Sequence, residues 1–274
     1  MTWQPGAMEN AYTHGHHESV LRSHRWRTAE NSCGYLIPHL RPGLRLLDVG
    51  CGPGTITMDL AALLGPGGHV TALERTEDAL DLARAEAARR GTANVDFAVG
   101  DVTSLSLPDD SFDVVHAHQV LQHVDDPVRA LREMRRVCRP GGIVGVRESD
   151  YGGFVWYPQV PELDRWLEVY TRVARGNHAE PDAGRRLMSW ARAASFADVA
   201  GGSSTWCYTG PADRMWWGGL WADRVVDSDL ARQAVAQGVA TAEELDRIAA
   251  GWRAWAEHDD GWFSVLHGEL VARV

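Results

Sequence analysis

The pattern of apolar and polar positions along the first 150 residues predicts strands that alternate with helices. Residues 44–49 form an almost continuous apolar run, which is typical of a strand buried on both faces of a parallel sheet. Residues 55–64 and 78–90 instead repeat apolar positions at helical spacing. Short apolar runs at residues 70–74 and 95–99 add two further strands. This alternation predicts an α/β fold built on a parallel sheet.

The same alternation continues to about residue 149. Residues 112–115 read as a fourth strand. Asp126 and Pro127 then suit the N-cap and the first position of a helix. The segment 139–142, Arg-Pro-Gly-Gly, ends that helix, and residues 143–146 read as a fifth strand. The chain up to this point therefore predicts five parallel strands.

The pattern changes after residue 150, where aromatic residues become frequent. Ten of the 12 tryptophans lie in this part of the chain. The pattern predicts two helices, two strands and a helical insertion between those strands. The helices are expected at residues 161–175 and 182–194, and the strands at residues 199–209 and 262–274.

A glycine-rich turn separates the first strand from the helix that follows it. Gly50, Gly52 and Gly54 permit positive φ and let a ligand approach the backbone closely. A strand, a glycine turn and a helix N-terminus together form a nucleotide-type site at the carboxyl edge of a sheet. The dinucleotide fingerprint would need glycine where Thr55 stands, which disfavours a nicotinamide dinucleotide.

Three acidic residues stand at the ends of successive predicted strands. Asp48 ends the first strand, Glu74 the second, and Asp101 follows the third. Glu74 lies where a Rossmann-like sheet places the carboxylate that accepts hydrogen bonds from both ribose hydroxyls. The set predicts a nucleoside-type ligand along this edge of the sheet.

These features resemble the class I S-adenosylmethionine (SAM)-dependent methyltransferases. The run from Asp48 to Gly54 matches their D-x-G-x-G-x-G motif, and the likeness is continuous over residues 12–149. Residues 12–32 resemble the N-terminal region of a type 11/25-like small-molecule methyltransferase subfamily. The resemblance implies a Rossmann-like sheet of seven strands in the order 3-2-1-4-5-7-6, with strand seven antiparallel. It also implies an N-terminal helical lid and a C-terminal helical insertion.

The resemblance divides the chain into three parts and assigns a cofactor. We expect a lid at residues 1–40, a SAM-binding core at residues 41–150, and substrate-side helices and loops with the last two strands at residues 151–274. SAM would be converted to S-adenosylhomocysteine (SAH). Glu74 would bind the ribose, Asp101 the adenine amino group and Arg27 the methionine carboxylate. The residues expected to contact SAM are Arg27, Asp48, Gly50, Gly52, Glu74, Arg75, Asp101, Val102, His118 and Gln119.

The expected reaction is methyl transfer to N, O or C of a small aromatic or heteroaromatic molecule of secondary metabolism. Alignment and exclusion of water would do most of the work, because the sulfonium is already a strong electrophile. His118 is the first candidate for a base, since histidine titrates near neutral pH. The other candidates are His123, Tyr12 and His16. The residues expected to contact the substrate are Tyr12, Tyr151, Phe154 and Trp156.

Composition and net charge limit the classes of partner that the protein is expected to bind. The net charge of -10 disfavours nucleic acid and anionic membranes. All 27 basic residues are arginine, which excludes a Schiff-base lysine. Four scattered cysteines and a polar N-terminus predict a reduced cytoplasmic protein, as a monomer or homodimer. The histidines at 14, 16 and 17 are interpreted as part of a polar cap over a cleft, so no metal is expected.

Two other functions remain open from the sequence. A SAM-binding relative that does not transfer methyl, either cyclase-like or regulatory, would carry the same binding motif. A nicotinamide oxidoreductase is a weaker alternative because of Thr55 and Asp101.

Overall fold

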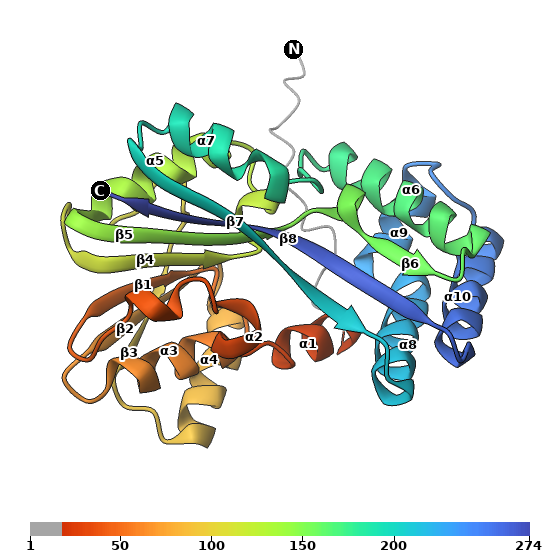
Figure 1. Ribbon diagram of the computed structural model, residues 1–274, viewed down its shortest axis with the longest axis horizontal. Helices are drawn as coiled ribbons and strands as arrows, with labels where there is room; N and C mark the ends of the chain where they lie inside the picture. Colours follow the sequence, from red (N-terminus) through yellow and green to blue (C-terminus); the bar gives the residue numbers. More distant parts are fainter. Residues whose placement is uncertain (1–17) are drawn as a thin grey trace, which may run out of the picture.

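A computed structural model describes residues 18–274, which form one sheet with helices on both faces (Figure 1). The strand order is β3-β2-β1-β4-β5-β8, with β6 and β7 also paired to β8. The first five of these strands are parallel, and β8 runs antiparallel to β5 and to β7. The strands are β1 Arg45–Val49, β2 His69–Glu74, β3 Val95–Val99, β4 Phe112–His118, β5 Cys138–Ser149, β6 Val155–Tyr157, β7 Asp198–Tyr208 and β8 Trp262–Arg273.

The predicted topology is confirmed, with one additional strand. The expected sixth and seventh strands are β7 and β8, and the antiparallel direction of the last strand is observed. The extra strand is β6, a short segment that pairs with the start of β8. No strand was predicted at these residues. Three residues are too few to give a recognisable alternation, so this strand depends on the partner that β8 provides.

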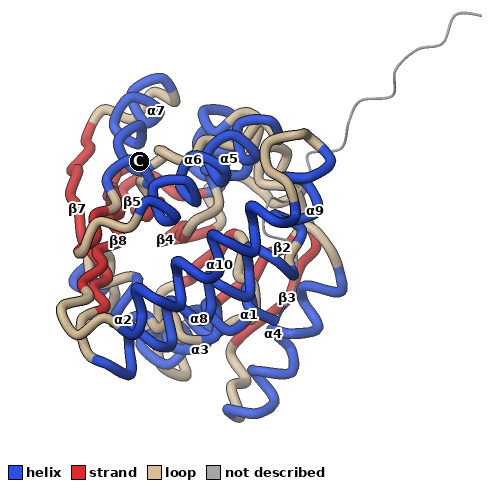
Figure 2. The backbone as a smooth tube through the Cα atoms, turned by 90° about the vertical axis from the view of Figure 1, so that its right-hand side faces the viewer, coloured by secondary structure: helices blue, strands red, loops and turns tan. Residues whose placement is uncertain are grey.

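Helices cover the two faces of the sheet and extend beyond one end of it (Figures 1 and 2). The α-helices are α1 Glu18–Arg25, α2 Ala29–Ser32, α3 Thr55–Leu64, α4 Glu77–Arg90, α5 Pro127–Val137, α6 Pro161–Gly176, α7 Leu187–Ala193, α8 Pro211–Asp227, α9 Asp229–Ala236 and α10 Ala242–Glu257. Short 3-10 helices are η1 Ile37–His39, η2 Leu121–His123, η3 Tyr151–Gly153 and η4 Gly184–Arg186.

Two apolar clusters hold the sheet between its helices. On one face, α2 and α3 pack against β1, with Leu36, Leu46 and Leu60 fully buried. On the other face, α5 and α7 pack against β4 and β5. The N-terminus of α5 is as predicted: Asp126 accepts a hydrogen bond from the backbone N–H of Arg129 at 2.8 Å, and Pro127 is the first helical residue.

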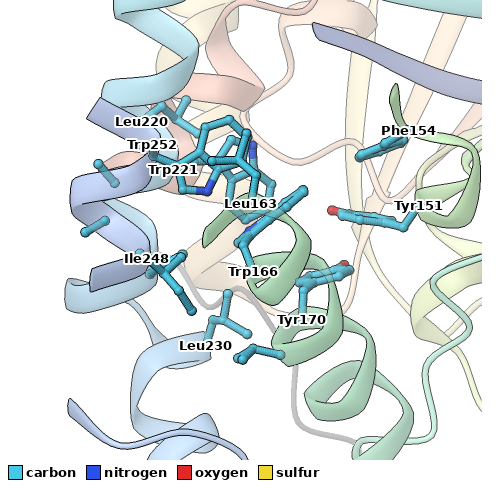
Figure 3. Packing of buried hydrophobic residues seen from close by; sticks show 14 of the residues in the cluster. Tyr151, Phe154, Leu163, Trp166, Tyr170, Leu220, Trp221, Leu230, Ile248 and Trp252 are labelled. Carbon is cyan, nitrogen blue, oxygen red and sulfur yellow. The ribbon is translucent and has the colours of Figure 1, made fainter. Parts of the chain in front are cut away.

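A third cluster lies beyond the sheet, among α6, α8, α9 and α10, and it is dominated by aromatic rings (Figure 3). Trp166 of α6 is 1% exposed and meets Trp221 at 4.5 Å and Trp252 at 4.9 Å between ring centroids. Both contacts are edge-to-face, the geometry that the ring quadrupoles favour. This cluster fixes α8 beside the carboxyl ends of the strands, where the candidate site lies.

We expect Trp166→Ala to lower the free energy of unfolding by about 3–5 kcal/mol, because it leaves a cavity in the centre of this cluster. Trp262→Ala removes the same side chain from a site that is 38% exposed, so it should cost much less. Chemical denaturation of the two variants tests the difference. Equal losses would mean that the aromatic cluster is not a rigid core.

Candidate active site

The glycine turn between β1 and α3 brings the backbone close to two neighbours. Gly50 has φ of 67°, and a Cβ there would lie 2.5 Å from Cγ2 of Val120. The backbone N–H groups of Gly50 and Cys51 both donate to the carbonyl of Leu73 in β2. Gly52 has φ of 52° and nothing within 4 Å of the position of a Cβ. The turn is therefore held at Gly50 and Cys51 by β2 and Val120, and it is open at Gly52.

A cavity of about 800 Å³ begins at this turn and extends to α1, β7 and α8. Its volume is in the range of sites that enclose a cofactor or a drug-sized ligand. All ten residues predicted to contact SAM line it. His123, Tyr151 and Phe154 line it as well. Tyr12 and His16 lie outside the described residues, so their assigned roles stay predictions.

Glu74 connects the end of β2 to the glycine turn. Its Oε1 accepts a hydrogen bond from the backbone N–H of Gly52 at 2.9 Å, and its Oε2 accepts one from that of Arg75 at 3.0 Å. The carboxylate is half-buried and lines the cavity. These two hydrogen bonds orient the Glu74 carboxylate. Its two acceptor oxygens suit a vicinal diol.

Asp101 stands after β3 at the rim of the same cavity. Its Oδ1 accepts hydrogen bonds from the backbone N–H and the hydroxyl of Thr103, both at 2.7 Å. Burial raises the pKa of this carboxyl. The hydrogen bonds from Thr103 and the charge of Arg75 lower the pKa by more, so the net shift is downward. Asp101 is therefore an anionic acceptor near neutral pH.

Asp48 is different from the other two acids because it is 3% exposed and fully engaged. Its Oδ2 accepts from the hydroxyl of Thr57 at 2.6 Å, and its Oδ1 lies 2.7 Å from Nδ1 of His116. Nε2 of His116 in turn lies 3.2 Å from Sγ of Cys33. This buried chain was not predicted, since its members are far apart in the sequence.

His116 carries a charge in the centre of that chain. Burial lowers its pKa, but Cys33 and Asp48 raise it more, to about 10. The imidazolium and the Asp48 carboxylate thus form a buried ion pair beneath the glycine turn. Asp48 lines the cavity, yet its oxygens are directed to protein partners.

His118 is the least satisfied polar side chain in the cavity wall. It is 6% exposed, and neither ring nitrogen has a hydrogen-bond partner among the described residues. Burial, followed by the charges of Arg27 and Arg147, lowers its pKa well below the usual range. The ring is neutral near pH 7 and can bond to a ligand through either nitrogen.

His123 is a weaker candidate than His118. Its Nε2 lies 2.9 Å from Nε2 of Gln122, and burial with the charge of Arg27 lowers its pKa to about 3. Its Nε2 is already engaged by Gln122, whereas neither ring nitrogen of His118 has a hydrogen-bond partner among the described residues.

Arg27 links the segment between α1 and α2 to the end of β4. Its Nη2 donates to Oε1 of Gln119 at 2.7 Å, and its guanidinium lies 5.6 Å from the ring centroid of Trp206. Nε2 of Gln119 donates to the hydroxyl of Ser149 at 2.7 Å. The N-terminal segment is therefore joined to two strands at the cavity.

Aromatic rings form the half of the cavity away from the glycine turn. Trp26 lies 5.3 Å from Trp206, 5.8 Å from Tyr208 and 5.5 Å from Trp216 between centroids. These residues were not among those predicted to contact the substrate. The aromatic wall, as we call it, consists of Trp26, Trp206, Tyr208, Trp216, Trp217 and Trp221.

Of the three described residues that were predicted to contact the substrate, two line the cavity. Tyr151 and Phe154 stack at 4.5 Å and contribute to its wall. Trp156 lies outside the lining, because its ring stacks on Phe263 at 5.6 Å in the aromatic cluster. Alternation along β6 separates it from the exposed Val155 and Tyr157.

Within residues 18–274 no three His, Cys, Asp or Glu side chains are grouped closely enough to bind a metal ion. Nor does any helix there have the length and apolar character needed to cross a membrane.

Comparison with known proteins agrees with this geometry. Residues 40–195 match a family described as a methyltransferase domain. An uncharacterized methyltransferase of Schizosaccharomyces pombe is 34% identical over 95% of both chains. A probable methyltransferase of Aspergillus luteorubrus, ltbC, is 29% identical over 96% of this chain and 97% of its own. Among solved structures, the 4+2 cyclase SpnF is 26% identical with a TM-score of 0.50, covering 93% of this chain and 80% of its own.

The buried Asp48–His116 pair should make stability depend on pH. Removing one partner of a buried ion pair costs about 3–5 kcal/mol, which is our expectation for His116→Gln. The pKa of His116 in the folded protein is about 10, above the ordinary value of about 6.5. Its stabilising contribution is therefore complete below about pH 6.5 and is lost as the pH rises through 10.

Urea denaturation between pH 6 and pH 10 measures this effect. The free energy of unfolding should fall over that interval in the native protein and fall less in His116→Gln. His69→Gln is the matched control, since His69 pairs with Asp96 at 2.9 Å on the surface and should contribute less than about 1 kcal/mol. Identical pH dependence in all three proteins would contradict the ion pair.

Proposed function

This chain belongs to the class I SAM-dependent methyltransferases, and we propose that it methylates a small aromatic or heteroaromatic acceptor. One observation carries the proposal: a single cavity joins the glycine turn and its acids to the aromatic wall. The cofactor half and the acceptor half of a methyl-transfer site would then be continuous. Two reactants held side by side gain the large advantage of an intramolecular reaction.

The residues of the cofactor half fit SAM. The open space at Gly52 leaves room beside the turn, where a side chain would intrude. In our proposal Glu74 binds the ribose hydroxyls, Asp101 the adenine amino group and Arg27 the methionine carboxylate. A guanidinium matches a carboxylate with two parallel hydrogen bonds. SAM itself supplies an electrophilic methyl group, and the chain supplies orientation and shelter from water.

The N-terminal segment would act as a lid over both halves. Arg22 of α1 pairs with Asp223 of α8 at 3.0 Å, and Trp26 reaches into the aromatic wall. The segment is also held by the hydrogen bond of Arg27 to Gln119 and by those of Arg224 to the carbonyl of Ser19 and the hydroxyl of Ser23, all of which opening would have to break. Opening would admit the substrate, and closure would exclude water.

The aromatic wall supports a flat acceptor. Its rings offer large apolar faces, and a planar ligand gains from offset or edge-to-face contact with them. His118 lies beside Trp206, at 5.9 Å between ring centroids, and its two nitrogens are available to the ligand. We propose that His118 bonds to the acceptor group and takes its proton where the reaction releases one.

A cyclase-like activity is the second candidate, because the chain is similar to the solved cyclase SpnF. Labelled methyl separates the two functions. The enzyme is incubated with SAM carrying a ¹³C-methyl group and a panel of phenols, quinols, indoles and flavonoids, and the products are analysed by mass spectrometry. We expect labelled product together with SAH. Conversion without any gain of label would favour a cyclase and contradict methyl transfer.

Cofactor binding should depend on the two acids at the rim of the turn. Glu74→Ala and Asp101→Ala each remove a charged acceptor, and such hydrogen bonds contribute about 1.5–3 kcal/mol. We therefore expect SAM affinity to fall about ten- to a hundredfold in each variant. Calorimetric titration measures it, with Glu77→Ala as a control on the exposed surface of α4. Native affinity in both variants would contradict the assignment.

His118→Ala should slow turnover by about a hundredfold or more if His118 takes the proton. SAM affinity should change little. Because the pKa of His118 is lowered, the activity of the native protein should fall only below about pH 6.5. In the variant this fall in activity with acidity should be absent. His123→Ala is the comparison and should have a smaller effect. Near-native turnover in His118→Ala would show that the reaction needs no base from this residue.

A further inference from the structure

The loop after β4 forms part of the cavity wall, and its main chain is held by a residue of the neighbouring strand. Gln119 begins the loop with φ of 56°, a conformation that residues other than glycine seldom adopt. The backbone N–H groups of Val120 and Leu121 donate to Oε1 of Glu148 at 2.9 and 2.7 Å. The N–H of Gln122 donates to Oε2 at 3.3 Å. One carboxylate thus binds three successive amides.

Holding the loop with Glu148 requires the burial of a carboxylate, which costs free energy. Glu148 is 0% exposed, and although the charge of Arg27 acts on it, no ion pair among residues 18–274 includes it. Burial raises the pKa of its carboxyl to about 7, although the three N–H donors lower it. An isolated buried carboxylate costs several kcal/mol, which three hydrogen bonds offset in part. A local Ser or Asp would cap η2 without this cost.

The loop after β4 packs directly against the glycine turn. Cγ2 of Val120 lies 2.5 Å from the place where a Cβ on Gly50 would be, so the valine packs directly on the turn. Gln119, Val120 and His123 all line the cavity. The side chain of Gln119 is also bonded to Arg27 of the N-terminal segment. A shift of this loop would therefore move the turn, the cavity wall and the attachment of Arg27 together.

We propose that Glu148 is a positioning residue for methyl transfer, which fixes the main chain of residues 119–123 against the glycine turn and the cofactor. This inference rests on the proposed function, because it assigns the loop to the cofactor site. Glu148 contacts the loop only through backbone amides, so it acts through the residues it holds. Catalytic geometry is sensitive to displacements of about 1 Å, which is why a rigid support is worth its cost.

Glu148→Gln tests the proposal, because it keeps the shape of the side chain and removes one acceptor oxygen and the charge. SAH is the probe, and no acceptor substrate is needed. We expect SAH affinity to fall about tenfold, measured by calorimetry. Hydrogen exchange at the amides of Val120, Leu121 and Gln122 should accelerate about tenfold more than exchange in β4.

Asp113→Asn is the matched control. Asp113 accepts a hydrogen bond from the backbone N–H of Arg45 at 2.7 Å, at the opposite end of the sheet from the cavity. Both variants exchange a carboxylate for an amide and should lose stability. Only Glu148→Gln should lose SAH affinity, whereas a structural role alone would leave both variants with native affinity. Equal SAH affinity in the two variants would overturn the proposal.

Two further results keep the proposal separate from the assigned function. If Glu148→Gln does not fold, hydrogen exchange in the native protein decides the question. The amides of residues 120–122 must then exchange as slowly as those of β4, and rapid exchange at residues 120–122 would overturn the proposal. If the native protein binds no SAH at all, the proposed function fails. If it binds SAH and Glu148→Gln binds it equally well, only the role of Glu148 fails.

Discussion

The ion pair between Asp48 and His116 is the constraint on which the cofactor half of the site depends. It joins β1 to β4, and through Thr57 and Cys33 it also reaches α3 and the segment after α2. Two opposite charges in an apolar interior are stable only when their hydrogen bonds are complete. The pair therefore fixes the spacing of the strand ends from which the glycine turn begins.

The acceptor half of the cavity depends on packing outside the sheet. Trp217 and Trp221 of α8 line the cavity and also belong to the aromatic cluster that holds α6, α8, α9 and α10 together. A ring that serves both purposes cannot move without disturbing the cluster, because protein interiors are densely packed. The shape of the acceptor site is thus set by the core, while Trp26 from the N-terminal segment completes it.

The charges around the cavity are arranged in a consistent way. The carboxyl groups of Glu74 and Asp101 stand at the cofactor end. Burial and nearby arginines lower the pKa of His118, so its ring is neutral. The aromatic rings beside His118 attract a cation such as a sulfonium through their π faces. A neutral imidazole beside them does not repel it. This arrangement suits methyl transfer better than chemistry that needs a charged base.

The sequence located the first five strands and the glycine turn, because strand ends and tight turns are local features, and the family resemblance implied the strand order. The ten residues expected to contact SAM all line the cavity, and their roles stay predictions. The sequence did not identify the Asp48–His116–Cys33 chain, the support from Glu148 or the rings at Trp206 and Trp216. Each of these depends on groups brought together from distant segments. Trp156 illustrates the same limit: it was predicted to contact the substrate, but in the strand β6, paired with β8, its side chain lies in the core. Local chemistry is written in the order of residues, whereas the direction in which a side chain points is decided by the partner strand or helix that packs against it.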